Sequence, residues 1–177
     1  MKKLLTIAFA VSFIHSYAQT DLDPVTVTAS ISKTKISATG RDVTLIKGEV
    51  FNKLPVHSID ELLRYVPGIE VQQRGPQGSQ SDILIRGGSF QQVLVILDGI
   101  RLNDPLTGHF NSYIPIAPAE IERVEILKGA SSAIYGSEAV GGVIHIITKT
   151  YTAKQGDKHK EFSAQARIGE YDLANVN

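Results

Sequence analysis

Two groups of residues have types and spacings that could support catalysis or nucleotide binding. The first lies in the glycine-rich stretch SAIYGSEAVGGVIHIITK, where Gly136 and Gly141 are spaced as in a phosphate-binding loop. Gly142 and Val143 stand where that loop carries lysine and a hydroxyl residue, and the glycines precede a strand instead of following one. We therefore interpret Gly141 and Gly142 as allowing close approach to packed neighbours, and Gly136 as ending a short helical turn.

The second group is acidic and could be an acid/base pair: Glu120, Glu122 and Glu125 lie within six residues of one another. Arg123 and Lys128 lie among them, which favours a solvated or salt-bridged face. The chain has no cysteine and no GxSxG motif, so neither a thiol nor a hydrolase-type serine nucleophile is indicated. The residues give no reason to expect an enzyme, and no catalytic residue is predicted.

The histidines indicate neither a metal site nor a resident cofactor. None has the spacing of a zinc site, and isolated surface or core positions explain most of them. His109 is the exception, because it shares an exposed loop with Asn111 and Tyr113 and is a candidate for ligand contact. The five are His15, His57, His109, His145 and His159.

Residues 1–18 have the pattern of a secretory signal peptide. Lys2 and Lys3 precede an apolar run over residues 4–14, and Ser16 and Ala18 have the spacing that a signal peptidase reads. The alternative is a buried N-terminal helix. Cleavage after Ala18 would leave 159 of the 177 residues, enough for one domain, with 16 basic and 18 acidic residues. This charge balance indicates no nucleic-acid partner.

Residues 19–40 are rich in Thr, Ser and Ala, and we expect a flexible segment there. Within it, PVTVTA alternates with period two and has no apparent hairpin partner. Such a strand suits addition to the sheet edge of another protein. An edge strand of the adjacent domain is the alternative.

Residues 41–149 have the pattern of an α+β domain with a mixed sheet of short strands and short helices. Ser58 and Glu61 form a capping-box pattern at the start of a helix, and Asp98-Gly99 predicts a hairpin turn. Polar, Gly- and Pro-containing stretches at 72–81 and 103–112 predict exposed loops. Strands are expected over 42–46, 93–97, 100–102, 123–127 and 143–148, and a short helix over 48–53.

The last residues differ in pattern from this domain. Residues 150–160 are polar and linker-like, and in 161–177 Phe162, Ala164, Ala166 and Ile168 alternate with more polar residues. This alternation is typical of the first strand of a transmembrane β-barrel, and equally of a half-buried strand in a soluble sheet.

In order along the chain, the export signal and six motifs resemble the N-terminal part of a TonB-dependent outer-membrane receptor. The motifs are DPVTVTA, SIDELLRYVPGIEV, DILIRGG, VLVILDGIRLND, IERVEILKGASSAIYGSEAVGGVIHIITK and the barrel-like strand. The resemblance implies a plug domain over 41–149. It also implies a TonB box that adds a strand to the periplasmic domain of TonB, formed by Val25, Thr26, Val27, Thr28 and Ala29.

The same resemblance implies the remaining sites. Apical plug loops touch a small-molecule substrate in this family, and the matching residues are Gln73, Arg74, Gln77, Thr107, His109 and Asn111. Arg86 and Arg123 match arginines that pair with carboxylates of the barrel wall. The LNDPLTGH loop resembles cobalamin-type receptors more than iron-siderophore or haem receptors.

The length of the chain bears on the barrel partner. A plugged transporter barrel has about 22 strands of about 9–11 residues each, whereas 28 residues follow Lys149. We expect a fragment, a truncated product or a plug that acts with a separate barrel chain. The predicted function is the plug and energy-coupling segment of an outer-membrane transporter, with its N-terminus in the periplasm. A stand-alone secreted or periplasmic ligand-binding module is the alternative, located in the periplasm if the chain ends at Asn177.

Overall fold

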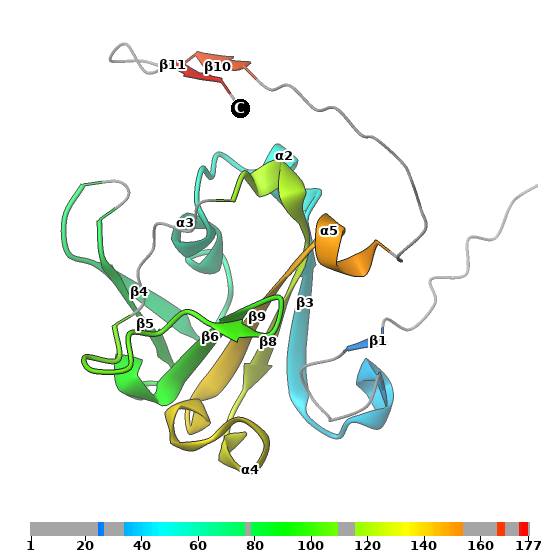
Figure 1. Cartoon of the computed structure of the whole chain (residues 1–177), viewed down its shortest axis with the longest axis vertical. Helices are drawn as coiled ribbons and strands as arrows, with labels where there is room; N and C mark the ends of the chain where they lie inside the picture. The colour runs from blue at the N-terminus through cyan, green and yellow to red at the C-terminus, as the bar shows by residue number, and fades with distance from the viewer. Residues whose placement is uncertain are drawn as a thin grey trace, which may run out of the picture.

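A five-stranded mixed sheet forms the centre of the protein (Figure 1). The computed structural model describes residues 25–26, 34–76, 79–109, 116–153, 166–168 and 174–176. The spatial order of the sheet is β3-β8-β9-β6-β7, and β6 with β9 is its parallel pair. Its strands are β3 (Asp42–Lys47), β6 (Val93–Leu97), β7 (Ile100–Arg101), β8 (Ile121–Lys128) and β9 (Gly142–Thr148). The predicted α+β class with a mixed sheet is confirmed, as are the expected strands.

One face of the sheet carries the larger part of the core. Two short helices, α2 (Val50–Lys53) and α3 (Ile59–Leu63), lie over it together with strand β5. Leu62 and Leu63 of α3 are fully buried because successive apolar positions on a short helix face the sheet. Their partners in the sheet include Val93, Val95, Val124, Ile126, Ile144 and Ile146. No helix among the described residues is long and apolar enough to cross a membrane.

The start of α3 differs from the predicted capping box. The Ser58 side chain makes no capping hydrogen bond, although its backbone is extended as an N-cap requires. Glu61 instead accepts a hydrogen bond at 2.7 Å from the backbone N–H of His57, one residue further back. The Glu61 carboxylate thus reaches back to the backbone that precedes the helix. The other bond of a capping box, from a backbone N–H of the first helical turn to the Ser58 hydroxyl, is absent.

A separate hairpin packs beside the sheet. Strands β4 (Ile69–Gln73) and β5 (Ser81–Ile85) pair antiparallel, with Gln73 opposite Ser81 next to the connecting loop. Ile83 and Ile85 of β5 are buried in the main core, whereas β4 alternates between half-buried and exposed positions. The hairpin is therefore anchored through β5.

The second face of the sheet is smaller and contains buried polar groups. Its apolar cluster is capped by α4 (Ser132–Tyr135) and the 3-10 turn η4 (Ser137–Ala139). Glu125 and His145 lie opposite each other on β8 and β9, and Arg123 donates to Glu125 at 2.8 Å. Glu125 is completely buried, so the pairing with Arg123 is what makes a carboxylate tolerable there. The apolar cluster consists of Leu94, Ile96, Leu127, Ala139 and Val143.

The glycine-rich stretch serves close packing, as the sequence predicted. A Cβ added to Gly142 would lie 2.5 Å from the carbonyl oxygen of Leu127 and 2.8 Å from Cδ1 of Ile85. Gly136 ends α4 with a φ of 91° and donates its N–H to the carbonyl of Ser132. These backbone requirements account for both glycines without a bound phosphate.

The Asp98-Gly99 turn joins β6 to β7 and also ties down the end of β9. Both turn residues have positive φ, 48° and 89°, as a tight hairpin turn requires. The Asp98 carboxylate accepts from the backbone N–H of Thr148 at 2.8 Å and from its hydroxyl at 2.7 Å. Helix α5 (Lys149–Thr152) begins directly afterwards, with the Thr148 side chain as its cap. The turn is therefore a structural joint between two parallel strands.

Short strand pairs lie near both ends of the chain. Strand β1 (Val25–Thr26) pairs antiparallel with β2 (Thr34–Lys35), which leads into the 3-10 turn η1 (Ile36–Ala38). The expectation that the PVTVTA strand lacks a hairpin partner is wrong for Val25 and Thr26, which pair with Lys35 and Thr34. Strands β10 (Ala166–Ile168) and β11 (Ala174–Val176) also pair antiparallel.

Truncation of a core side chain on α3 tests the packing. We expect Leu63→Ala to lower the free energy of unfolding by about 2–5 kcal/mol, because Leu63 is fully buried and its removal leaves a cavity. The matched control is Leu106→Ala, since Leu106 is 94% exposed. Urea unfolding of both variants measures the difference, and equal losses would contradict this core assignment.

Burial of His145 predicts a pH dependence of stability. Desolvation lowers the pKa of His145, assisted by Arg123 and opposed by Glu125 and Asp98. The unfolded chain, with an ordinary histidine, then binds more protons as the pH falls below about 6.5. Stability is therefore fully present above that pH and is lost on acidification.

The variant His145→Gln removes this titration. Its free energy of unfolding should fall less steeply than that of the wild type between about pH 6.5 and 5. Urea midpoints measured across this range provide the comparison, since every other histidine is present in both proteins. Parallel pH profiles would show that His145 does not titrate differently in the folded state.

Candidate functional site

Two loops lie side by side, one after β4 and the other after β7. The first is closed by a hydrogen bond from the Arg74 N–H to the Gln80 carbonyl. Gln73, at its base, accepts from Arg64 at 2.7 Å and donates to the Pro76 carbonyl at 3.2 Å. Both polar ends of the Gln73 side chain thus already stabilise this loop. Gln77, also predicted to contact substrate, lies outside the described residues.

The second loop is shaped by two polar residues. Asn103 accepts from the Val95 N–H at 2.7 Å and donates to the Val93 carbonyl at 2.9 Å, which extends the pairing of β6 through a side chain. Asp104 accepts from the N–H groups of Leu106 and Thr107, both at 2.8 Å. These two bonds lower the pKa of the Asp104 carboxyl, and the bond from the Thr107 N–H has the larger effect. The loop is therefore held in one tight turn.

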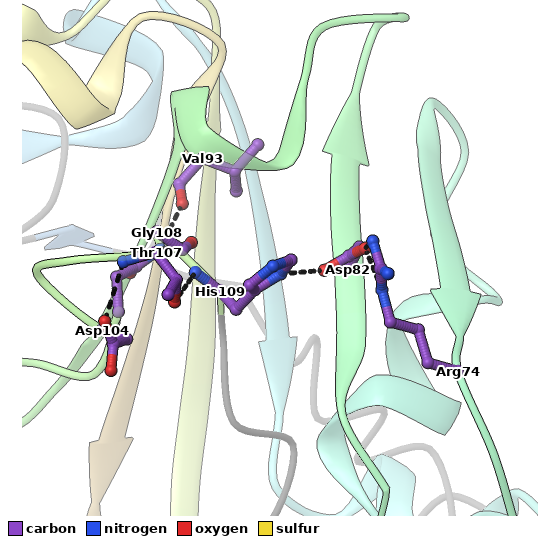
Figure 2. Close-up of polar contacts among 8 residues, drawn as sticks. Arg74, Asp82, Val93, Asp104, Thr107, Gly108 and His109 are labelled. Atoms are coloured by element: carbon purple, nitrogen blue, oxygen red, sulfur yellow. Dashed lines mark hydrogen bonds and ion pairs between the residues drawn. The ribbon is translucent and has the colours of Figure 1, made fainter.

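Asp82 joins the two loops, as Figure 2 shows. Its side chain is 2% exposed, yet it accepts from Arg74 of the first loop and contacts His109 of the second. The Arg74 Nε and Nη2 lie 2.8 and 2.6 Å from Oδ2, and the His109 Nδ1 lies 2.7 Å from Oδ1. Each carboxylate oxygen thus serves a different loop.

His109 is held on its ring face as well as at its edge. Phe90 of the 3-10 turn η2 (Phe90–Gln92) stacks on the imidazole with ring centroids 4.3 Å apart and planes 8° from parallel. The backbone carbonyl of His109 also accepts a hydrogen bond from the Asp104 N–H at 3.0 Å. The histidine is therefore preorganised rather than free to rotate, while its side chain remains 23% exposed.

The structure brings Arg74, Thr107 and His109 together among the predicted substrate residues. Thr107 is exposed and its hydroxyl accepts from the His109 N–H at 3.4 Å. Asn111 lies outside the described residues. Within the described part of the chain, no three side chains of the metal-ligating types gather into a metal site.

The sequence analysis missed Asp82, Phe90 and Asn103, on which these two loops depend. Asp82 is the one acidic residue in the otherwise apolar strand DILI, which was a usable signal of a buried charge with a partner. Its partners are His109, 27 residues later in the chain, and Arg74, eight residues earlier, and only the tertiary structure reveals that they meet at Asp82.

The two predicted barrel-contact arginines have partners within the same domain. The Arg86 Nη2 lies 2.5 Å from Oδ2 of Asp42, and both side chains are about half exposed. Arg123 donates to Glu125, and its side chain is 21% exposed. Neither pairing tests the predicted contact with a barrel. Of the predicted TonB box, Val25 and Thr26 form β1, and Val27, Thr28 and Ala29 lie outside the described residues.

The chain is similar to vitamin B12 transporters in sequence and to a siderophore receptor in fold. The vitamin B12 transporter BtuB of Vibrio cholerae serotype O1 (strain ATCC 39541) is 37% identical over 99% of this chain and 29% of its own length. BtuB of Vibrio vulnificus (strain CMCP6) is 36% identical over 88% of this chain and 26% of its own. The solved structure of FpvA of P. aeruginosa, in an iron complex with a pyoverdine, matches 71% of this chain and 16% of its own, with 25% identity and a TM-score of 0.56.

These matches agree with the fold and with the order of motifs along the chain. The chain spans little more than a quarter of the length of the curated relatives. A sequence profile of the TonB-dependent Receptor Plug Domain matches residues 35–143, which include strands β3, β6, β7 and β8, the first two residues of β9 and both loops up to the end of the described part of the second. The chain therefore belongs to the family of TonB-dependent receptor plug domains.

Proposed function

We propose that this chain is the plug and energy-coupling segment of an outer-membrane active transporter for cobalamin. The observation that carries the proposal is the 36–37% identity with vitamin B12 transporters, which extends over 88–99% of the chain. The similarity covers the plug and its flanking segments, so it includes the predicted TonB box. The relatives are named as transporters and receptors, which supports transport rather than catalysis as the activity.

The partners follow from the same relationship. A β-barrel supplies the wall around the plug, either as the continuation of this chain or as a separate one. Exposed apolar side chains on the plug region support a covering partner, because Tyr65 and Ile100 are 56% and 69% exposed. Tyr65 also lines an apolar groove of about 250 Å³ beside the edge strand β3, together with Thr44, Ile46, Val50, Leu54, Leu62, Val66 and Pro67.

The substrate meets the two loops joined by Asp82. Arg74 is 55% exposed and can still donate outward, and His109 and Thr107 lie beside it. The periplasmic domain of TonB adds to the strand of the TonB box and pulls on the plug. In that arrangement the N-terminus faces the periplasm.

An iron-siderophore is the second candidate substrate. The fold likeness to the pyoverdine-bound FpvA structure favours it, at 25% identity. Cobalamin stands first, since the identity with the vitamin B12 transporters is higher and covers more of the chain.

Deletion of the gene tests the substrate. Uptake of radiolabelled vitamin B12 by the deletion strain should fall to the background of a strain without TonB, and the intact gene should restore it. Uptake of ferric pyoverdine, measured in the same strains, should not change. Loss of siderophore uptake with normal vitamin B12 uptake would transfer the assignment to the second candidate.

A backbone change in the TonB box tests energy coupling. We expect Val27→Pro to abolish uptake while ligand binding at the cell surface persists, because proline removes a main-chain donor from the added strand. Val27→Ala is the matched control, since it keeps the donor and should retain uptake. Normal uptake by the proline variant, with equal amounts of protein in the outer membrane, would contradict strand addition at Val27.

A further inference from the structure

The Asp82 carboxylate determines which nitrogen of His109 carries the proton. Oδ2 accepts a hydrogen bond from Nε of the Arg74 guanidinium, which is always charged, and lies 2.6 Å from its Nη2 in an ion pair. A carboxylate held by such a partner is ionised and can only accept hydrogen bonds. The 2.7 Å contact between Oδ1 and the His109 Nδ1 therefore requires a proton on Nδ1.

The consequence lies at the other ring nitrogen. In the neutral imidazole a proton on Nδ1 leaves Nε2 with a lone pair, so Nε2 is a hydrogen-bond acceptor. No described residue makes a hydrogen bond to Nε2, and the side chain is 23% exposed. Because Phe90 and Asp82 hold the ring at its face and edge, the direction of this lone pair is fixed.

We propose that Asp82 is a positioning residue that presents the Nε2 of His109 as an acceptor, so that this site selects a ligand with a hydrogen-bond donor there. An amide N–H or a hydroxyl meets this requirement. An anionic or carbonyl oxygen at the same place would face the lone pair and be disfavoured. This inference rests on the proposed function for its ligand, since the peripheral carboxamides of cobalamin supply such N–H donors.

The variant Asp82→Asn reverses the arrangement with almost no change in shape. Arg74 can only donate, so the amide oxygen of the asparagine must occupy the position of Oδ2. The amide NH2 then faces Nδ1, which has to accept. The proton of His109 moves to Nε2, and Nε2 changes from an acceptor into a donor of hydrogen bonds to the ligand.

The first measurement is the tautomer itself. Nitrogen-15 spectra of the native protein that contains this chain, labelled at histidine, distinguish a protonated ring nitrogen from an unprotonated one. His109 is identified by the signals that disappear in His109→Gln. At about pH 8, above the ordinary titration range of histidine, the wild type should carry its proton on Nδ1 and Asp82→Asn on Nε2. A wild-type proton on Nε2 would overturn the proposal without the need for any variant.

A second pair of variants separates this effect from a loss of structure. In Asp82→Asn combined with Arg74→Met, the arginine no longer orients the amide, and either its oxygen or its NH2 can face Nδ1, so a population with the proton on Nδ1 should reappear beside the Nε2-protonated one. Glu138→Gln is the matched control, because it also converts a carboxylate partner of an arginine, Arg101, into an amide. It should leave the His109 tautomer unchanged. A double variant whose His109 proton stays wholly on Nε2, as in Asp82→Asn alone, would contradict control by the Arg74-oriented Asp82 side chain.

The third measurement is equilibrium binding of vitamin B12 to the same proteins. Asp82→Asn should weaken binding on the order of ten- to a hundred-fold, because a donor then faces a donor, and Glu138→Gln should bind as the wild type does. Unchanged binding after a change of tautomer would refute the role of Nε2 in selection. Failure of the wild type to bind vitamin B12, with the proton on Nδ1, would instead refute the proposed substrate and leave the tautomer assignment standing.

Discussion

Strand β9 is the constraint on which the rest of the structure depends. All seven of its residues are buried, and it pairs antiparallel with β8 on one side and parallel with β6 on the other. A strand covered on both faces needs apolar side chains in both directions, and the run VIHII supplies them. Its first residue must be glycine, because the Leu127 carbonyl and the Ile85 side chain leave no room for a Cβ. The glycine-rich approach to β9 is therefore a packing requirement.

Burial of β9 also explains where polar groups are tolerated in the sheet. His145 and Thr148 lie on the buried strand itself, and Glu125 lies on its neighbour. Arg123 donates to Glu125, and Asp98 accepts from both donors of Thr148, so Glu125 and Thr148 are hydrogen-bonded where they are buried. The bonds from Thr148 to Asp98 also join the end of β9 to the turn after β6, 50 residues earlier in the chain. The polar groups thus add register and connection to a core that apolar contacts alone would leave less specific.

The two loops depend on this framework through the strands from which they emerge. Strand β5 is anchored in the core by Ile83 and Ile85, which places the preceding Asp82 at the edge of the core. Asn103 extends the pairing of β6 through its side chain, and the loop that follows it places His109 next to Asp82. One buried carboxylate can then hold two loops, since each of its oxygens has its own partner. A loop held in this way loses less conformational entropy when it binds a ligand.

The sequence by itself determined the class of the fold, the strands of the sheet and the Asp98-Gly99 hairpin, because these follow from local periodicity and turn chemistry. It also indicated the family through the order of its motifs and placed His109 and Arg74 on exposed loops. Only the tertiary structure decided that Asp82 connects them, that Glu61 caps the chain before its helix, and that Val25 and Thr26 have a partner in β2. Such contacts join residues that are distant in the chain or compete with equally plausible neighbours, and sequence spacing carries no information about which of them meet in space.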